Sequence, residues 1–120
     1  MRRLILSLEG RVDVAGILAR SGEVFGQQAR RRYSALLDVA LRDLLDDPKA
    51  VGSQLRPDLA AGVYVYHLRH SRQRARVAGT IVSDPRHLIL YEFDAAEVRV
   101  MRILHEAMDL ARHIPARGQP

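Results

Sequence analysis

A long amphipathic stretch from Phe25 to Asp47 constrains the fold of this chain more than any other part of the sequence. Its apolar residues recur every three or four positions and form one stripe, while glutamines, arginines and aspartates occupy the other side. The pattern predicts a helix of roughly 30 Å or more. Ser21 is the expected N-cap, Glu23 falls in the first turn, and the residues before Pro48 end the helix. The rest of the domain must pack on this helix.

Chain length and the absence of cysteine limit the class of protein. The chain has 120 residues, of which 48% are apolar, so we expect one α+β domain over residues 1–115 and a flexible tail over 116–120. Without cysteine there are no disulfides or thiolate metal sites, which fits a reducing cytoplasm. The apolar run after Arg3 is too short for a signal peptide or a membrane span. We therefore expect a soluble cytoplasmic protein with no membrane partner.

The basic excess has two possible origins. Lysine and arginine number 19 against 14 acidic residues, a net charge of +5. A positive field attracts nucleic acid or an acidic protein segment. The basic residues are almost all arginine and alanine is abundant, which is equally typical of a GC-rich genome.

The segments around the long helix have weaker patterns. Arg3 to Leu8 predicts a strand, and Gly10 to Ala19 predicts a helix that ends at Ser21-Gly22 and is weakened by its two glycines. The two helices should form an αα-hairpin. After Pro48 we expect a loop over 51–60, antiparallel strands joined by short connections, and a short terminal helix that stops at Pro115. The predicted strands cover 62–70, 75–83, 87–94 and 97–104, and the terminal helix covers 105–114.

The predicted strands are apolar on both faces. Ile81 with Val82 and Ile103 with Leu104 are adjacent apolar pairs, whereas a sheet covered on one face alternates apolar with polar residues. The helices cover one face. The other needs a cover of its own, either the terminal helix or a partner chain.

Three spaced motifs resemble a known family. The pattern FG..A..Y...L......L..DP...G runs from Phe25 to Gly52, DPRHLILY follows from Asp84, and RILHEAMDLARHI begins at Arg102. Their order and residues resemble the ParE branch of the RelE/ParE toxins of bacterial type II toxin–antitoxin modules. The resemblance covers most of the chain and is loosest between Gln54 and Gly79.

That resemblance implies a toxin without a cofactor that inhibits DNA gyrase by binding, arrests growth, stabilises plasmids and is neutralised by a cognate ParD-like antitoxin. Relatives in the RelE branch are ribosome-dependent mRNA endonucleases, which need positioned acid–base groups. The stretch HLRHSRQRAR with His87 and Tyr91 has suitable residue types, but nothing in the spacing arranges them, so we name no catalytic residue. A basic nucleic-acid-binding domain is a further alternative, in which Arg72, Arg74 and Arg76 share one face of a hairpin. The ParE resemblance favours protein partners over direct nucleic-acid binding.

A metal site is not expected. His105, Asp109 and His113 recur every four residues, but the first and last would lie roughly 12 Å apart along a helix axis. His67 and His70 would point to opposite faces of a strand.

Two sets of contact residues are predicted. The antitoxin should bind the helical hairpin and a sheet edge or face, through Val14, Leu18, Phe25, Tyr33, Leu37, Tyr64 and Tyr66. The target should be contacted by polar residues held among apolar ones near the C-terminus, namely Arg86, His87, Arg99, Arg102, His105, Asp109, Arg112 and His113. Alternatively, the C-terminal segment is a structural latch in which Asp109 pairs with an arginine such as Arg86 and Leu110 closes the core.

Overall fold

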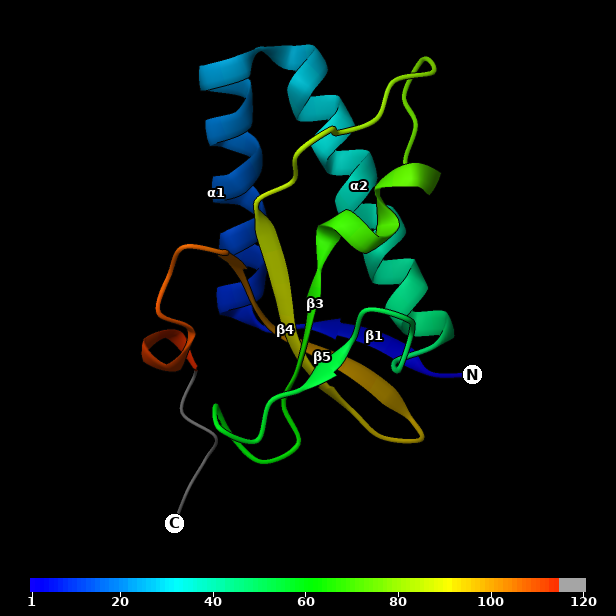
Figure 1. The fold of residues 1–120 in the computed structure, drawn as a ribbon, viewed down its shortest axis with the longest axis vertical. Coiled ribbons are helices and arrows are strands. Elements are labelled where there is room, and N and C mark those ends of the chain that lie inside the picture. The colour runs from blue at the N-terminus through cyan, green and yellow to red at the C-terminus, as the bar shows by residue number, and fades with distance from the viewer. Residues whose placement is uncertain (115–120) are drawn as a thin grey trace.

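Two long helices pack on one face of a five-stranded sheet in the computed structural model, which describes residues 1–114 (Figure 1). The expected stop at Pro115 and the tail at 116–120 lie outside the described residues. The α+β fold is confirmed. Within residues 1–114 no helix is both long and apolar enough to cross a membrane.

The helical hairpin differs from the prediction at its bend. Helix α1 spans Leu8–Phe25 and α2 spans Gln27–Asp46, with Gly26 between them at φ +92°. Ser21 is therefore not an N-cap but a buried residue inside α1, and Glu23 also belongs to α1. Glycine adopts this left-handed conformation without steric cost, so the chain turns there although the apolar spacing continues through it. The predicted end of α2 before Pro48 is confirmed.

The first turn of α1 is fixed against the sheet. The Ser7 hydroxyl accepts a hydrogen bond from the Gly10 N–H at 2.9 Å and donates one to the Met101 carbonyl at 2.6 Å. A side chain at Gly10 would lie 3.5 Å from the carbonyl oxygen of Val100. Gly10 thus lets the helix approach the sheet closely, rather than only weakening the helix.

The sheet is mixed, with strand order β1-β5-β4-β3-β2. The edge strand β1 (Arg3–Leu6) pairs in parallel with β5 (Glu97–His105), whereas the other neighbours are antiparallel. Short connections make neighbouring strands antiparallel from β2 onward, as predicted. The edge strand β1 is different, because its partner β5 lies far along the chain. The remaining strands are β2 (Gln54–Leu55), β3 (Tyr64–His67) and β4 (His87–Phe93).

Three predicted elements differ from the structure. Residues 75–83 do not form a strand: Val77 and Thr80 make an isolated bridge around a tight turn, in which Ala78 and Gly79 have positive φ. The strand predicted over 62–70 ends early because His67 caps the 3₁₀ helix η1 (Leu68–Arg74) by accepting the Arg69 N–H. The terminal helix is a single 3₁₀ turn, η2 (Leu110–His113).

The arginines of the predicted basic hairpin consequently do not share one strand face. Arg72 donates to the Ser83 carbonyl at 2.8 Å and Arg76 donates to the Gly79 carbonyl at 3.3 Å. Arg74 pairs with Asp43 of α2. Arg72 and Arg76 thus contact the 75–83 segment, whereas Arg74 joins η1 to α2.

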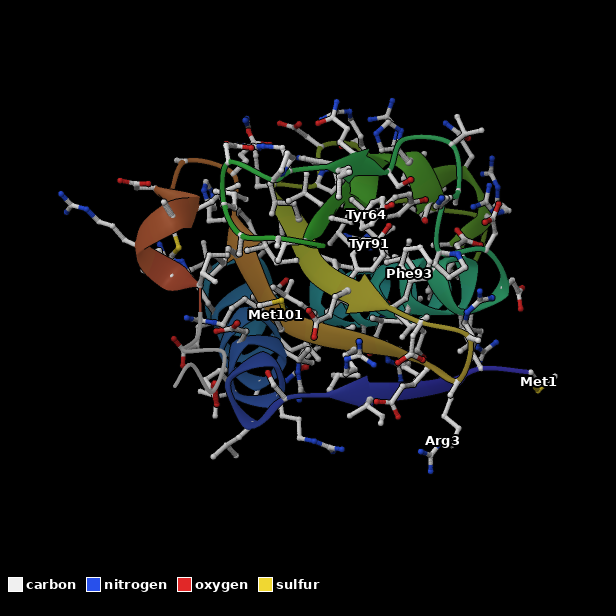
Figure 2. The ribbon with its side chains drawn as sticks, turned by 90° about the horizontal axis from the view of Figure 1, so that it is seen from below. Met1, Arg3, Tyr64, Tyr91, Phe93 and Met101 are labelled. Atoms are coloured by element: carbon white, nitrogen blue, oxygen red, sulfur yellow. The ribbon has the colours of Figure 1, made fainter. Side chains whose placement is uncertain are left out.

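The core lies on both faces of the sheet. On the helix side, Leu36, Leu44 and Ala40 of α2 pack with Ile89 and Tyr91. Figure 2 shows Tyr64, Tyr91 and Phe93 gathered on neighbouring strands, and the rings of Tyr64 and Tyr91 stack at 5.7 Å.

The second face has a smaller cluster that includes Val65, Leu90 and Met101. Leu59 and Ala60 of the loop before β3 pack against it, as do Leu110 and Ile114 of the C-terminal segment. The terminal segment thus covers this face in part, which is one of the two predicted alternatives, and Leu110 packs against the cluster.

Candidate functional site

An apolar cleft of about 1310 Å³ lies between the helical hairpin and the end of the sheet. Its walls come from α1, the first turns of α2, the segment before β4, the end of β5 and the C-terminal turn. Val12, Val24 and Phe25 line it and are 62%, 55% and 75% exposed. Large side chains in water on one wall of a cleft are typical of a protein-binding surface.

The cleft brings members of the two predicted contact sets together. Phe25 and Tyr33 from the antitoxin set line it, and so do Arg86, His87, Arg102, His105 and His113 from the target set. Arg99, Asp109 and Arg112 do not.

The other predicted antitoxin contacts lie away from the surface of the cleft. Val14 and Leu18 are half-buried against the main core. Leu37 and Tyr66 are buried, and Tyr64 packs beside them against Tyr91. These five side chains hold the hairpin on the sheet in the free chain.

Tyr33 and His87 form the floor of the cleft. Tyr33 Oη and His87 Nδ1 are 2.6 Å apart, and the Arg86 N–H donates to the same hydroxyl at 3.2 Å. The His87 ring packs edge-on to His105 at 5.3 Å. Burial raises the pKa of Tyr33 to about 12. Burial, together with the neighbouring His105 and His67, lowers the pKa of His87 to about 4.

Glu106 joins three elements beside this floor. Its carboxylate accepts from His67 Nε2 at 2.7 Å and from Arg86 Nη1 at 3.0 Å, and these two hydrogen bonds lower its pKa. Arg86 also pairs with Asp84. Arg86, the partner suggested for Asp109, is therefore not its partner, and Asp109 pairs with Arg112 of the same terminal turn instead.

Arg102 has its donors occupied inside the chain. Its Nε and Nη2 atoms donate to the two carboxylate oxygens of Asp13 on α1 at 2.7 and 2.9 Å, and its Nη1 donates to the His113 carbonyl at 3.2 Å. The hydrogen bonds with Asp13 raise the pKa of the guanidinium. Asp13 also accepts the Ile103 N–H. This arrangement ties α1, β5 and the C-terminal turn to one another.

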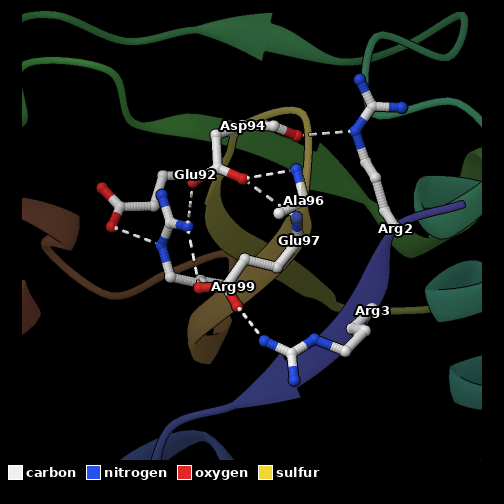
Figure 3. Close-up of polar contacts among 7 residues, drawn as sticks. All are labelled: Arg2, Arg3, Glu92, Asp94, Ala96, Glu97 and Arg99. Atoms are coloured by element: carbon white, nitrogen blue, oxygen red, sulfur yellow. Dashed lines mark hydrogen bonds and ion pairs between the residues drawn. The ribbon is translucent and has the colours of Figure 1, made fainter.

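Arg99 lies on β5 near the turn that joins it to β4, and Figure 3 shows its polar contacts. It contacts the carboxylates of Glu92, Asp94 and Glu97 at 3.1, 2.8 and 3.0 Å. Hydrogen bonds with these acids, Asp94 first, raise its pKa. Arg3 pairs with Glu97, which joins β1 to the same network. Arg99 therefore stabilises the β4–β5 hairpin, and the structure separates it from the cleft.

The cleft floor is poorly suited to acid–base catalysis. A general acid or base works best when its pKa lies near the working pH, whereas the pKa values of Tyr33 and His87 are displaced in opposite directions away from neutrality. Each group also holds the other through a short hydrogen bond. Within residues 1–114 no group of three or more histidine or acidic residues could hold a metal ion.

Sequence reasoning missed Asp13, Glu106, Arg20 and Arg32, of which Asp13 and the two arginines line the cleft. Asp13 had a local signal, because it is a carboxylate beside Val14 on a largely apolar helix. Such a carboxylate normally has a partner when it packs against a sheet. The identity of that partner, Arg102, had no local signal.

Comparison with known families agrees with this geometry. The family model described as the ParE toxin of the type II toxin–antitoxin system, parDE, matches residues 9–110. A search of curated proteins finds no match. The fold and the family match together define a toxin of a type II toxin–antitoxin system, whose partner is an antitoxin. The chain belongs to the ParE toxin family.

Proposed function

We propose that this chain inhibits DNA gyrase by binding to it, and that a ParD-like antitoxin neutralises it by occupying the cleft. The single observation that carries the proposal is the open apolar cleft in a chain of the ParE toxin family. Gyrase acts in the bacterial cytoplasm, so the chain works there. Growth arrest of cells that lose the antitoxin gene would stabilise a plasmid that carries both genes.

The cleft has the features of a surface for an amphipathic helix. Exposed Val12 and Val24 lie on one helix, Phe25 stands at the hairpin bend, and Met108 faces them from the other wall. A helix in a groove uses apolar anchors at intervals of three or four residues, which such walls can accept. Burial of a large apolar side chain contributes about 1.5–3 kcal/mol, so a few anchors supply a stable complex.

Gyrase and antitoxin would then compete for one surface. The target candidates His105 and His113 line the same cleft as the antitoxin candidates Phe25 and Tyr33. A bound antitoxin would cover both sets. Neutralisation follows from exclusion of the target and needs no change in the toxin's fold.

The test combines a gyrase supercoiling assay with antitoxin binding. The chain is co-expressed with the protein encoded by the neighbouring reading frame, purified with it and then separated from it. We expect the free chain to block supercoiling and the complex to leave gyrase active. Phe25→Asp should weaken the complex, whereas the matched control Val51→Asp, at an exposed residue outside the cleft lining, should not. A free chain that leaves gyrase active but cleaves ribosome-bound mRNA would contradict the proposal and support the RelE-type alternative.

A further inference from the structure

One line of exposed positions along α1 is apolar. Its members follow one another at intervals of four, three and four residues, and they are Leu8, Val12, Ala15 and Ala19. This spacing places them on one side of the helix, opposite the face that packs on α2 and β5. Helix α1 runs along one side of the domain (Figure 1), and Leu8 is 73% exposed. These four residues are called the α1 seam below.

The exposed positions of α2 have a different character. They carry charged side chains, among them Arg31, Asp38, Arg42 and Asp46. A surface helix normally presents such residues to water, as α2 does, whereas an apolar outer side on α1 indicates a contact with another molecule. The α1 seam is distinct from the cleft, because only Val12 of its four residues lines the cleft.

The side-chain sizes of the α1 seam fit a second copy of the same seam. When two α1 helices run antiparallel about a twofold axis, Leu8 of one copy lies level with Ala19 of the other. Val12 then lies level with Ala15 of the second copy. Every layer thus joins a large side chain to a small one, an alternation that lets two helices interlock closely.

The charges beside the α1 seam fit the same arrangement. Glu9 and Arg20 are eleven residues apart on α1, or about three turns, so they project in nearly the same direction. Within the described part of the chain neither side chain has a hydrogen bond or ion pair. In the antiparallel pair, Glu9 of each copy comes within about one turn of Arg20 of the other. Two ion pairs of opposite charge can therefore form between the copies.

We propose that two copies of the free toxin associate through antiparallel α1 helices, with the α1 seam at the centre and the Glu9–Arg20 pairs at its border. The inference goes beyond the proposed function, because it concerns contact between two toxin chains and requires neither gyrase nor antitoxin. A contact made by one helix face is small, and small interfaces are typical of weak, reversible association. We therefore expect a dimer that forms in the micromolar range.

Other occupants fit the α1 seam less well. Helices that lie on a membrane insert large apolar side chains, whereas two of the four seam residues are alanines. Nucleic acid binds through its phosphates and would leave Leu8 and Val12 in water. A segment bound in the cleft would meet only Val12 of the seam.

The self-association test uses the free toxin, separated from its antitoxin, and sedimentation equilibrium across the micromolar range. We expect the wild type to pass from monomer to dimer and no further, because a twofold contact closes on itself. Ala15→Glu should weaken the dimer about tenfold or more, since it places a carboxylate against Val12 of the second copy. The matched control is Ala61→Glu, at an exposed alanine in the loop between β2 and β3, and it should associate like the wild type.

A charge exchange tests the arrangement independently. Glu9→Arg and Arg20→Glu should each weaken the dimer about three- to tenfold, because like charges then face each other. The double variant Glu9→Arg/Arg20→Glu exchanges the two charges and should recover the wild-type association. In one chain these residues are about three turns apart, so recovery can come only from contact between two copies.

Three results would overturn the inference. The first is a wild type that stays monomeric across the micromolar range. The second is wild-type association of both Ala15→Glu and Leu8→Glu, and the third is a charge exchange that recovers nothing. Circular dichroism and thermal melting check that each variant folds. Should Ala15→Glu not fold, Leu8→Glu and the charge variants decide the question by the same criterion.

Discussion

The pair between Arg102 and Asp13 gives the sharpest test of whether the C-terminal motif is a latch or a target contact. Both side chains are largely buried, with 22% and 13% of their surfaces exposed, and two hydrogen bonds join them. Asp13→Ala leaves the Arg102 guanidinium and the Ile103 N–H without this acceptor. Hydrogen bonds to charged groups contribute about 1.5–3 kcal/mol, and removing one partner of a fully buried pair costs about 3–5 kcal/mol.

Partial exposure reduces that loss, because water solvates the remaining partner. We expect Asp13→Ala to lower the free energy of unfolding by about 2–3 kcal/mol, which corresponds to roughly 8–12 °C in melting temperature. Arg102→Met keeps most of the apolar stem and should cost about 1–2 kcal/mol. Since the two residues contact each other, the double variant should be more stable than the sum of the single effects by about 1–2 kcal/mol.

Urea denaturation of the four proteins in this double-mutant cycle measures the coupling. Supercoiling inhibition is then measured at equal concentrations of folded protein. The latch interpretation expects inhibition per folded molecule to stay close to wild type. If Arg102→Met abolishes gyrase inhibition while the unfolding free energy and the antitoxin affinity are unchanged, then Arg102 is a target contact and this reasoning is refuted.

Three further predictions concern single residues. Gly16→Ala should raise the unfolding free energy by about 1 kcal/mol, because the added methyl group has no heavy atom within 4 Å. The melting temperature should then be roughly 4 °C higher, and an unchanged or lower melting temperature would contradict this prediction. Because the pKa of His87 falls from 6.5 to about 4 on folding, the unfolded chain binds this proton first. Stability should therefore be level above pH 6.5 and fall as pH drops toward 4, and urea denaturation at about pH 7.5 and about pH 5.5 should show a smaller difference for His87→Gln than for wild type. Gly52 has φ +101° and an added Cβ would lie 2.5 Å from the His70 ring, so Gly52→Ala should cost about 2 kcal/mol or more by denaturation. His70→Ala in the same chain should recover only the steric part; full recovery would show that the backbone is not strained.

Strands β4 and β5 and the end of α2 were predictable from the sequence, because each depends on the types of neighbouring residues. The run from His87 and the run from Glu97 read as strands because apolar residues, several of them β-branched or aromatic, make up most of each run, and they form β4 and β5. The end of α2 was predictable because the residue before Pro48 leaves the helical region.

Features that depend on one backbone angle were not predictable from the pattern. The break at Gly26 interrupts a stretch whose apolar spacing looks continuous. Val77 and Val82 are typical strand residues, yet Ala78 and Gly79 between them turn the chain back, and Val82 lines the cleft instead of pairing in the sheet.

The candidate site was only partly predictable for a different reason. Phe25, Tyr33 and the C-terminal polar residues were named from the sequence, but as two separate surfaces. Asp13 and Arg102 are 89 positions apart, and no local pattern links them. The cleft joins the two sets only because α1 packs on β5, which periodicity does not reveal.

Because β1 pairs in parallel with β5, β1 has no neighbouring strand until β5 has been synthesised. Arg3 and Glu97 are 94 positions apart, so the first strand to leave the ribosome waits for one of the last before it has a neighbour. Contacts of such high sequence separation form late and slowly. Because residues from the end of β5 also form a wall of the cleft, a nascent chain has no complete cleft until β5 has been synthesised. A chain that ends before β5 therefore lacks one wall of the cleft.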